Sequence, residues 1–355
     1  METVRVDLGE DTYTVHIERG LFENLPLHLE AFARGRRTAV ITDTHVADLY
    51  GDSLCRAMKS AGMETKSIVI QAGEGHKNMD TIAQVYASLA AMDISRNDLI
   101  LAIGGGVVGD AGGFAAATYL RGIALVQVPT SIIAQVDSSV GGKVGIDLQS
   151  GKNQVGAFYQ PKAVYIDPQL LETLPRRCFR DGMGEVVKYG AVCDAELFEI
   201  LERSEPNALD WPDIIRRCVQ AKAAIVEDDV YDEGRRMLLN FGHTFGHAVE
   251  RYYGYGTYMH GEAVAVGMVR VTARTECLEL TEPGTAKRLE KLLRKYNLPV
   301  DVDGADEDIF SFVKRDKKRR GKDITLTIID RIGRGRLLPV ACEEVKNYLR
   351  RSVQP

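Results

Sequence analysis

Short apolar runs alternate with helical periodicities along the first half of the chain. Residues 2–17 alternate apolar and polar positions on both sides of Gly9, Glu10 and Asp11, and this pattern predicts a β-hairpin. Further apolar runs predict strands at 38–42, 67–70, 99–103, 123–128 and 163–166. Helical periodicity follows the first two of these runs, at 46–58 and 82–89. Strands that alternate with helices indicate an α/β domain with a parallel sheet covered on both faces.

The pattern changes after about residue 170. From there to about residue 300, helical periodicity predicts helices at 176–203, 211–229, 232–253, 260–280 and 284–296. A late strand pair is expected at 323–329 and 337–340. We therefore expect two domains that meet near Asp167-Pro168. The first, 1–167, is an α/β domain with a parallel sheet, and the second, 168–355, is mostly helical.

Composition and charge exclude several classes of protein. The 355 residues are 45% hydrophobic and 27% charged, which excludes a disordered chain. The formal net charge of −5 argues against a nucleic-acid partner. The sequence has neither an apolar run long enough for a membrane span nor an N-terminal signal pattern. Six cysteines without a CxxC pair predict reduced, mostly buried thiols in a cytoplasmic protein.

A glycine cluster follows the apolar run 99–103. Residues 104–110 read GGGVVGD and contain the spacing GxGxxG. Glycines at the start of a helix let a pyrophosphate approach backbone N–H groups, although the same residues also suit a tight turn without a ligand. No acid lies about 20 residues downstream, so Asp43, at the end of an earlier strand, is the better candidate for a ribose hydroxyl. The loop 73–77 follows another strand and is expected at the same edge of the sheet.

Two glycine–lysine pairs occur in the polar stretch from Pro129 to Asn153, for which we expect a long loop. Lys143 follows Gly142, and Lys152 follows Gly151. A lysine beside glycine can place its ammonium group against phosphate or carboxylate with little steric cost. A solvated surface loop is the alternative, but two such pairs in one long loop favour a functional role.

Three of the seven histidines fall between residues 243 and 260. His243 and His247 are four residues apart, which places both on one face of a helix, and Arg236 and Asn240 extend that stripe. Two histidines with one carboxylate suit an open, catalytic site for a divalent metal. The candidate acids are Glu185, Glu250 and Glu262. Glu185 lies in an otherwise apolar segment, where a charge without a partner would be costly. HExxH is absent, which excludes a protease-type zinc helix.

Taken together, these segments resemble the 3-dehydroquinate synthases, a family of sugar phosphate cyclases. The matching stretches are GGGVVGDAGGFAAATYLRG (104–122), QVPTSIIAQVDSSVGGKVGID (127–147), GKNQVGAFYQP (151–161), GMGEVVKYG (182–190), LNFGHTFGHAVE (239–250) and HGEAVAVGM (260–268). The resemblance implies an N-terminal NAD-binding domain and a C-terminal helical domain that holds a divalent metal, zinc or cobalt. It also implies a homodimer that acts on a phosphorylated sugar acid.

The resemblance assigns roles by position. The metal ligands fall on Glu185, His243 and His260. The catalytic and substrate positions fall on Arg121, Asp137, Lys143, Lys152, Asn153, Lys188, Lys222, Arg236, Asn240 and His247. The NAD contacts fall on Asp43, Glu74, Lys77, Gly105, Gly106, Val107, Val108, Gly109, Asp110, Thr130, Ser131, Lys143, Lys152, Leu170 and Thr173. One more family lysine corresponds to Lys317 or Lys318, within a charged run at 314–322 that otherwise suits a solvated face.

Three positions depart from the usual family pattern. His45 stands where asparagine is common, Ser131 replaces the second residue of a Thr-Thr pair, and Gly184 stands where alanine is common, beside the metal ligand Glu185. These departures touch no group to which we assign chemistry.

The implied reaction converts 3-deoxy-D-arabino-heptulosonate 7-phosphate to 3-dehydroquinate and phosphate, a step of aromatic amino acid biosynthesis through the shikimate pathway. NAD oxidises one hydroxyl transiently, the neighbouring proton becomes acidic, phosphate leaves, and reduction, ring opening and an aldol step follow. Three alternatives remain: another sugar phosphate cyclase that makes an inosose, a valiolone or an aminated dehydroquinate; a metal-dependent polyol dehydrogenase; and an inactive nucleotide-binding module. The many cations disfavour the second, and the complete set of site residues disfavours the third.

Overall fold

The computed structural model describes residues 1–304, 306–317 and 323–350, and these form two compact units. The first unit consists of Met1–Leu174 and Trp211–Glu227. The second consists of Pro175–Asp210 and the described chain from Asp228 onward. The division is therefore not a single cut along the sequence, because nearly all of α8 (Trp211–Asp228) belongs to the first unit.

A seven-stranded sheet forms the centre of the first unit. Its strands are β1 (Glu2–Val6), β2 (Tyr13–Ile17), β3 (Arg37–Asp43), β4 (Glu64–Ile70), β5 (Leu99–Gly104), β6 (Ala124–Pro129) and β9 (Ala163–Ile166). They lie in the order β1-β2-β9-β6-β5-β3-β4, and only the edge strand β1 runs antiparallel to its neighbour. The expected parallel sheet and N-terminal hairpin are confirmed.

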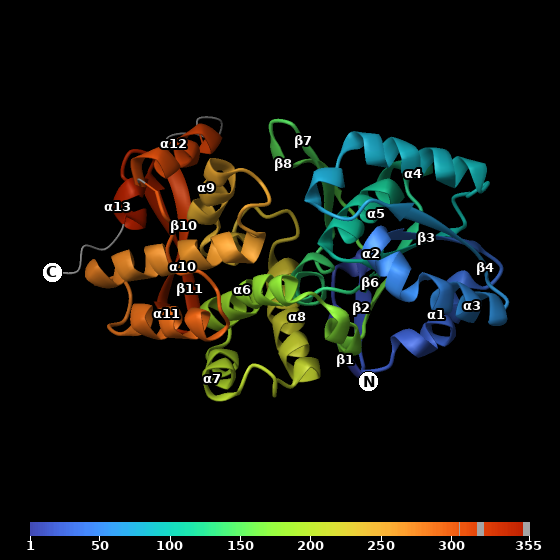
Figure 1. The fold of residues 1–355 in the computed structure, drawn as a ribbon, viewed down its shortest axis with the longest axis horizontal. Helices are drawn as coiled ribbons and strands as arrows, with labels where there is room; N and C mark the ends of the chain where they lie inside the picture. The colour runs from blue at the N-terminus through green and yellow to red at the C-terminus, as the bar shows by residue number, and fades with distance from the viewer. Residues whose placement is uncertain (305, 318–322, 351–355) are drawn as a thin grey trace. The chain divides into compact units, whose positions relative to one another are not determined.

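Helices cover both faces of this sheet, as the apolar strands require (Figure 1). They are α1 (Leu25–Ala33), α2 (Thr44–Val46), α3 (Asp52–Ser60), α4 (Met79–Ala91) and α5 (Gly106–Thr118). In β3, Ala39 and Ile41 pack with α4 and α5, whereas Val40 packs with α1 and α3 on the other face. Because successive side chains of a strand point to opposite faces of the sheet, this one strand contributes to the hydrophobic core on each face.

Two local predictions in the first unit are wrong. The helix expected at 46–58 is interrupted, because Ala47–Gly51 adopts a π-helical turn between α2 and α3. The loop expected from Pro129 to Asn153 contains a π-helical turn (Ala134–Ser138) and most of a hairpin, β7 (Lys143–Leu148) and β8 (Gly151–Phe158). Gly145 and Gly156 face each other in this hairpin, and a Cβ on Gly145 would lie 2.6 Å from the carbonyl oxygen of Val155. The glycines that suggested a loop instead allow two strands to approach closely.

The second unit is mostly helical, with one antiparallel strand pair (Figure 1). Its helices are α6 (Arg176–Val192), α7 (Ala195–Arg203), α9 (His243–Tyr253), α10 (His260–Cys277), α11 (Thr285–Lys295), α12 (Asp306–Lys317) and α13 (Val345–Leu349). The strands β10 (Asp323–Arg331) and β11 (Arg334–Ala341) confirm the expected late pair. The long helix α10 packs against α6, α9, α11 and α13, and most of its side chains are buried.

Two expected helices of this unit are broken. The segment predicted as one helix at 176–203 forms α6 and α7, because Asp194 caps a new helix. The segment 232–253 forms a 3₁₀ turn at Arg235–Asn240 and then α9, since Gly242 takes a left-handed conformation with φ +81°. Arg236 and Asn240 therefore do not continue the helical stripe of His243 and His247, and that prediction is wrong.

Cysteine burial and membrane topology test two further expectations. None of the six cysteines, all within the described residues, forms a disulfide. The expectation that they are mostly buried is wrong, because Cys218 is buried while Cys277 is exposed and the others are intermediate. Nowhere in the described chain does a helix reach the length and apolar character that crossing a membrane demands.

Candidate active site

Asp43 and the glycine turn lie at the carboxyl ends of two neighbouring strands of the first unit. Thr42 of β3 pairs with Ile103 of β5, so Asp43 and Gly104 leave the sheet at the same level. From β3 the chain moves outward to β4, and from β5 it moves the other way to β6, which makes this place a topological switch point. Open α/β sheets bind ligands at such points. Here the side chain of Asp43 accepts a hydrogen bond from Val46 N at 3.0 Å and caps α2.

The glycine turn leads directly into α5. Gly105 is the N-cap and the helix begins at Gly106. The first intrahelical bond runs from Gly109 N to Gly105 O, so the amides of Gly106, Val107 and Val108 precede it. Thr130 borders the turn through a bond from its N–H to Gly104 O, and a Cβ on Gly105 would lie 3.5 Å from Ser131 Oγ. This helix start can hold a phosphate group.

Lys77 is the centre of a buried ionic network beside this turn. Its Nζ lies 2.7 Å from Asn153 Oδ1, 3.1 Å from Asp110 Oδ2 and 3.1 Å from Glu74 Oε1. It also lies 3.7 Å from Asp147 Oδ1, and the side chain is only 4% exposed. Burial opposes the charge of Lys77, but the three carboxylates outweigh burial and raise its pKa. Burial in turn raises the pKa of Asp110 to about 6, against the opposing effect of Lys77.

The network also fixes the segment that carries Lys152 and Asn153. Asn153 has a left-handed backbone with φ +53°, and its N–H donates to Asp147 Oδ1 at 2.7 Å. Lys152 Nζ lies 3.9 Å from Glu74 Oε1. Asp147 was not among the residues that the sequence singled out. The feature of the sequence that could have indicated Asp147 is its place shortly before a turn that contains glycine, because carboxylates at such positions accept local backbone hydrogen bonds.

Asp137 and Lys222 are brought together although 85 residues separate them. Lys222, on α8, forms an ion pair with Asp137 Oδ1 and donates to Asp137 O at 2.6 Å. Lys222 is 6% exposed. The helical periodicity of the sequence predicted α8 as part of the C-terminal helical domain. In the structure, nearly all of α8 belongs to the first unit, and the contact with Asp137 lies within that unit.

The remaining predicted residues of the first unit are dispersed. Arg121 is exposed at the end of the turn Tyr119–Arg121 and has φ +68°. Lys143 is exposed at the start of β7. Leu170 is buried, and Thr173 Oγ1 lies 2.6 Å from the hydroxyl of Tyr50.

The family lysine expected at Lys317 or Lys318 cannot be assigned to either residue. Lys318 lies outside the described residues, and only the backbone of Lys317 is described.

Glu185, His243 and His260 converge in the second unit. Glu185 lies on α6, His243 is the first residue of α9, and His260 is the first residue of α10. Glu185 Oε1 lies 3.5 Å from His260 Nε2 and 3.8 Å from His243 Nε2. In a tetrahedral zinc site, bonds of about 2.0–2.1 Å place ligand atoms about 3.3 Å apart. The three side chains therefore fit a divalent metal ion and leave room for a fourth ligand.

The other ring nitrogens of both histidines face oxygen atoms. His243 Nδ1 lies 3.1 Å from Phe241 O, and His260 Nδ1 lies 3.6 Å from Glu250 Oε2. Metal-binding histidines commonly donate the second N–H to such an oxygen, which turns the free nitrogen toward the metal. Glu250 therefore supports His260. A second group of possible ligands, His247, Glu250 and His260, uses this same carboxylate and has an exposed member in His247.

The electrostatics of the three-residue group favour a bound cation. Both oxygens of Glu185 are buried without a hydrogen bond among the described residues, although Lys188 forms an ion pair with one of them. Burial lowers the pKa of His243, and the charge of Lys188 adds to this effect. For His260, burial disfavours the charge, but the nearby carboxylates of Glu185 and Glu250 outweigh burial and raise the pKa to about 10.

Gly184 owes its identity to the packing of α6 against α10. A Cβ on Gly184 would lie 2.6 Å from Gly261 O, so the two helices touch through their backbones beside the ligands. Alanine, which is common here in the family, would require this contact to widen. Glycine at 184 is therefore consistent with the packing in this chain.

The other residues predicted for this unit differ in burial. Lys188 is 1% exposed and lies beside Glu185. Arg236 is 2% exposed and donates to Val230 O at 2.6 Å. Asn240 and His247 are exposed. The ring centroid of His247 lies 5.4 Å from that of His243 and 5.8 Å from that of His260. His247 thus lies beside both histidines of the possible metal-binding group.

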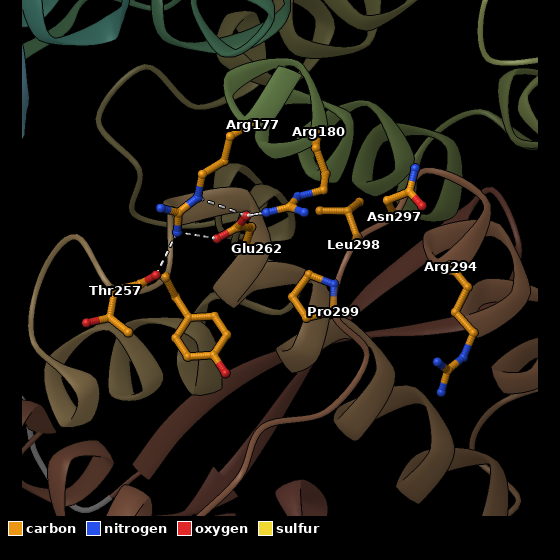
Figure 2. Close-up of a pocket in the computed structure, with 9 residues that line it drawn as sticks. Arg177, Arg180, Thr257, Glu262, Arg294, Asn297, Leu298 and Pro299 are labelled. Atoms are coloured by element: carbon orange, nitrogen blue, oxygen red, sulfur yellow. Dashed lines mark hydrogen bonds and ion pairs between the residues drawn. The ribbon is translucent and has the colours of Figure 1, made fainter. Parts of the chain in front are cut away.

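Glu262 is excluded as a metal ligand by its partners. Figure 2 shows its carboxylate between the guanidinium groups of Arg177 and Arg180, at the edge of a cavity of about 650 Å³. Oε2 of Glu262 also accepts from Met259 N at 3.0 Å. Burial opposes the charge of Glu262, but these bonds lower its pKa. The sequence analysis did not single out either arginine. Their spacing of three residues could have indicated that both lie on one face of a helix.

Comparison with solved structures places the fold among the sugar phosphate cyclases. One is 2-epi-5-epi-valiolone synthase from Streptomyces hygroscopicus subsp. jinggangensis with NAD⁺ and Zn²⁺ bound; it has a TM-score of 0.88 and 28% identity, with 97% of each chain covered. Another is 2-deoxy-scyllo-inosose synthase in complex with carbaglucose-6-phosphate, NAD⁺ and Co²⁺. It has a TM-score of 0.87 and 26% identity, over 98% of this chain and 99% of that one.

Sequence comparison narrows this class to one family. Residues 67–181 match the 3-dehydroquinate synthase N-terminal model, and residues 182–319 match the C-terminal model. The 3-dehydroquinate synthase of Clostridium acetobutylicum is 46% identical over 354 residues, which is 99% of each chain. The chain belongs to the 3-dehydroquinate synthase family.

Proposed function

We propose that the protein is a 3-dehydroquinate synthase that converts 3-deoxy-D-arabino-heptulosonate 7-phosphate to 3-dehydroquinate and phosphate. The observation that carries the proposal is the convergence of Glu185, His243 and His260 in a chain that belongs to this family. Identity to the synthase of Clostridium acetobutylicum is 46%, against 26–28% for the inosose and valiolone synthases. The dehydroquinate product is therefore better supported than either of theirs.

We assign the two cofactors to different units. NAD binds at the switch point of the first unit, with its phosphates at the start of α5 and a ribose near Asp43. Glu185, His243 and His260 hold a zinc or cobalt ion in the second unit. When bound, NAD accepts and returns a hydride, and the metal polarises the hydroxyl that is oxidised. Glu74, Lys77, Asp110, Thr130, Ser131, Leu170 and Thr173 complete the proposed NAD contacts.

The substrate carries a carboxylate and a phosphate, so fixed cations must bind both. Lys143, Lys152 and Lys222 of the first unit and Lys188 and Arg236 of the second supply them, together with Arg121. Asp137 keeps Lys222 in place through the ion pair between them. Asn240 and His247 orient hydroxyl groups or move protons, and Asn153 orients the substrate beside Lys152. Elimination of phosphate needs no protein base, because the departing phosphate can itself accept the proton.

Two further features belong to the proposal: a homodimer and a cytoplasmic location. The six cysteines without a disulfide suit a reducing compartment. Light scattering of the purified protein tests the dimer, and a mass of one chain would contradict it.

The decisive experiment measures stoichiometry. The protein is mixed with excess heptulosonate phosphate, a divalent metal and limiting NAD, and phosphate and NADH are followed over time. Many phosphates per NAD without lasting NADH are expected, because a cyclase returns the hydride to the same molecule. NADH that accumulates without phosphate would identify a dehydrogenase and overturn the proposal.

Product identity separates the cyclases from one another. Mass spectrometry should find dehydroquinate, and a seven-carbon sugar phosphate without a carboxylate should release little phosphate. An aminated substrate analogue, offered in parallel, tests for the amino-dehydroquinate alternative. His243→Ala, with its ligand atom removed, is the matched inactive control.

A further inference from the structure

The first turn of α10 is anchored to α6 by a carboxylate that does not belong to the metal-binding group. Asp181 Oδ1 accepts from Gly261 N at 2.6 Å and from Glu262 N at 3.3 Å. Asp181 is only 4% exposed. These amides are among the donors that a helix leaves unsatisfied at its start. The N-cap residue of α10 is Met259, whose thioether is a weak acceptor, and Glu262 accepts from Met259 N in a local capping box. Asp181 adds a charged oxygen acceptor from another helix to this local cap.

The spacing of the residues links this cap to the metal group. Asp181 and Glu185 are four residues apart on α6 and therefore lie on one face of it. His260 and Gly261 are consecutive on α10. The contact between Asp181 and Gly261 thus lies one helical turn from the contact between Glu185 and His260.

Close backbone packing makes this arrangement sensitive to small shifts. A Cβ on Gly261 would clash with the carbonyl oxygen of Asp181, and one on Gly184 would lie 2.6 Å from Gly261 O. The nearest atoms at these glycines are backbone atoms of the facing helix and Oδ1 of Asp181, so a small shift of α10 would change the hydrogen bonds of Asp181 directly. Glu262 adds a second attachment through Arg177 and Arg180, shown in Figure 2.

We propose that Asp181 is a positioning residue that holds the start of α10 so that His260 meets Glu185 and His243 around the metal. This inference rests on the metal site of the proposed function. Without the carboxylate, the first turn of α10 loses its acceptor, and His260, which begins that turn, loses its fixed position. Groups that orient metal ligands typically change metal affinity by about 10- to 100-fold.

Cobalt binding tests the proposal without substrate or NAD. Metal-free wild-type protein and the variants Asp181→Ala and Asp181→Asn are titrated with Co²⁺, and the dissociation constant and the visible absorption spectrum are recorded. Asp181→Ala should bind cobalt about 10- to 100-fold more weakly and show an altered spectrum. Asp181→Asn keeps an oxygen acceptor and should regain most of the affinity. Equal affinity in wild type and Asp181→Ala would overturn the proposal.

A matched control separates positioning from general stability. Glu276 of α10 accepts from Gly284 N at 2.9 Å and Ala286 N at 2.7 Å, so it caps the start of α11 in the same way. Glu276→Ala should lower the melting temperature but leave cobalt affinity and spectrum unchanged. If Glu276→Ala weakens cobalt binding as much as Asp181→Ala does, the positioning role is wrong.

Hydrogen exchange in the wild-type protein keeps the test valid should Asp181→Ala fail to fold. The amides of Gly261 and Glu262 should exchange slowly in the metal-free protein, because Asp181 holds them already. Exchange at the rate of an open helix start would overturn the proposal. Wild-type protein that binds no cobalt would overturn both this inference and the proposed metal site. Normal cobalt binding without dehydroquinate formation would count against the proposed function alone.

Discussion

Lys77 and Lys188 are both almost fully buried, but their surroundings differ. Lys77, in the first unit, lies within 3.7 Å of three carboxylates and is bonded to the amide oxygen of Asn153. Lys188, in the second, is paired with Glu185, whose oxygens lack hydrogen bonds within the described chain and also face two histidines. Three carboxylates surround the one ammonium group of Lys77, whereas Lys188, His243 and His260 all lie beside Glu185, and Glu250 lies beside His260.

We take this difference to separate a supporting network around Lys77 from the proposed reactive group around Lys188. Each partner of Lys77 comes from a different segment, the loop 74–77, α5, β7 or β8, so its charge joins these segments into one body. Around Lys188 lie the residues of the proposed metal site, Glu185, His243 and His260. A buried lysine alone thus does not indicate catalysis, and the balance of its partners decides.

The largest effect is expected from removal of a metal ligand. His243→Ala should lose bound metal and lower activity by at least about 100-fold, because even groups that only support ligands cost 10- to 100-fold. Elemental analysis and the phosphate assay measure the two losses, and circular dichroism should show an intact fold. A variant that retains one metal per chain would show that His243 is not a ligand.

Loss of the Lys188 ammonium should impair the reaction rather than the fold. Lys188→Met should lower turnover by about 100-fold or more, since a fixed charge that acts on the transition state contributes on that scale. Metal-loaded protein should keep nearly all its free energy of unfolding, because the metal still neutralises Glu185. Turnover close to that of wild type would remove Lys188 from the proposed catalytic group.

Loss of the Lys77 ammonium should instead impair the fold. Lys77→Met leaves Glu74, Asp110 and Asp147 without their shared counter-charge and should lower the free energy of unfolding by about 3–5 kcal/mol. Urea unfolding of Lys77→Met and Lys188→Met, side by side, measures the contrast. Equal destabilisation of the two variants would mean that the two sites do not differ as proposed.

The smallest expected effect concerns the reactivity of Cys193, which depends on the charge of Lys188 in the protein without substrate. Burial raises the pKa of Cys193 to about 11, and the nearby charge of Lys188 opposes this rise. Lys188→Met should therefore raise the pKa of Cys193 further and slow its alkylation a few-fold at pH 9, because less thiolate is present. Mass spectrometry of iodoacetamide-treated protein follows Cys193, with the exposed Cys277 as the internal control. An unchanged ratio would indicate a neutral Lys188.

Local pattern predicted the sheet well, because the sheet is built from short segments. Apolar runs such as 99–103 can only be buried strands or helices, and their length decides for strands. The rarity of histidine and the cost of a buried acid predicted a metal site in this region, and the family resemblance selected Glu185, His243 and His260, which the structure brings together. The β7–β8 hairpin was missed because its glycines resemble those of a loop, and their purpose appears only when two backbones meet.

Contacts between distant segments were beyond such reasoning. The pair of Asp137 and Lys222 depends on how α8 packs, and the cap that Asp181 provides for α10 depends on the approach of α6. Neither contact produces a pattern of apolar and polar residues from which it could be predicted. The break at Gly242 was missed because glycine is tolerated inside helices, and only its left-handed backbone reveals the helix start.

The membership of α8 in the first unit has a consequence for how the protein is made. Domains generally fold as they leave the ribosome, N-terminal parts first. Here the first unit lacks a helix, and Asp137 lacks Lys222, until residue 227 has been synthesised. By then Pro175–Asp210, including α6 with Glu185, has already emerged. The nascent chain must therefore hold part of the second unit unfinished while the first is completed, and a fragment that stops at Leu174 would lack a piece of its own structure.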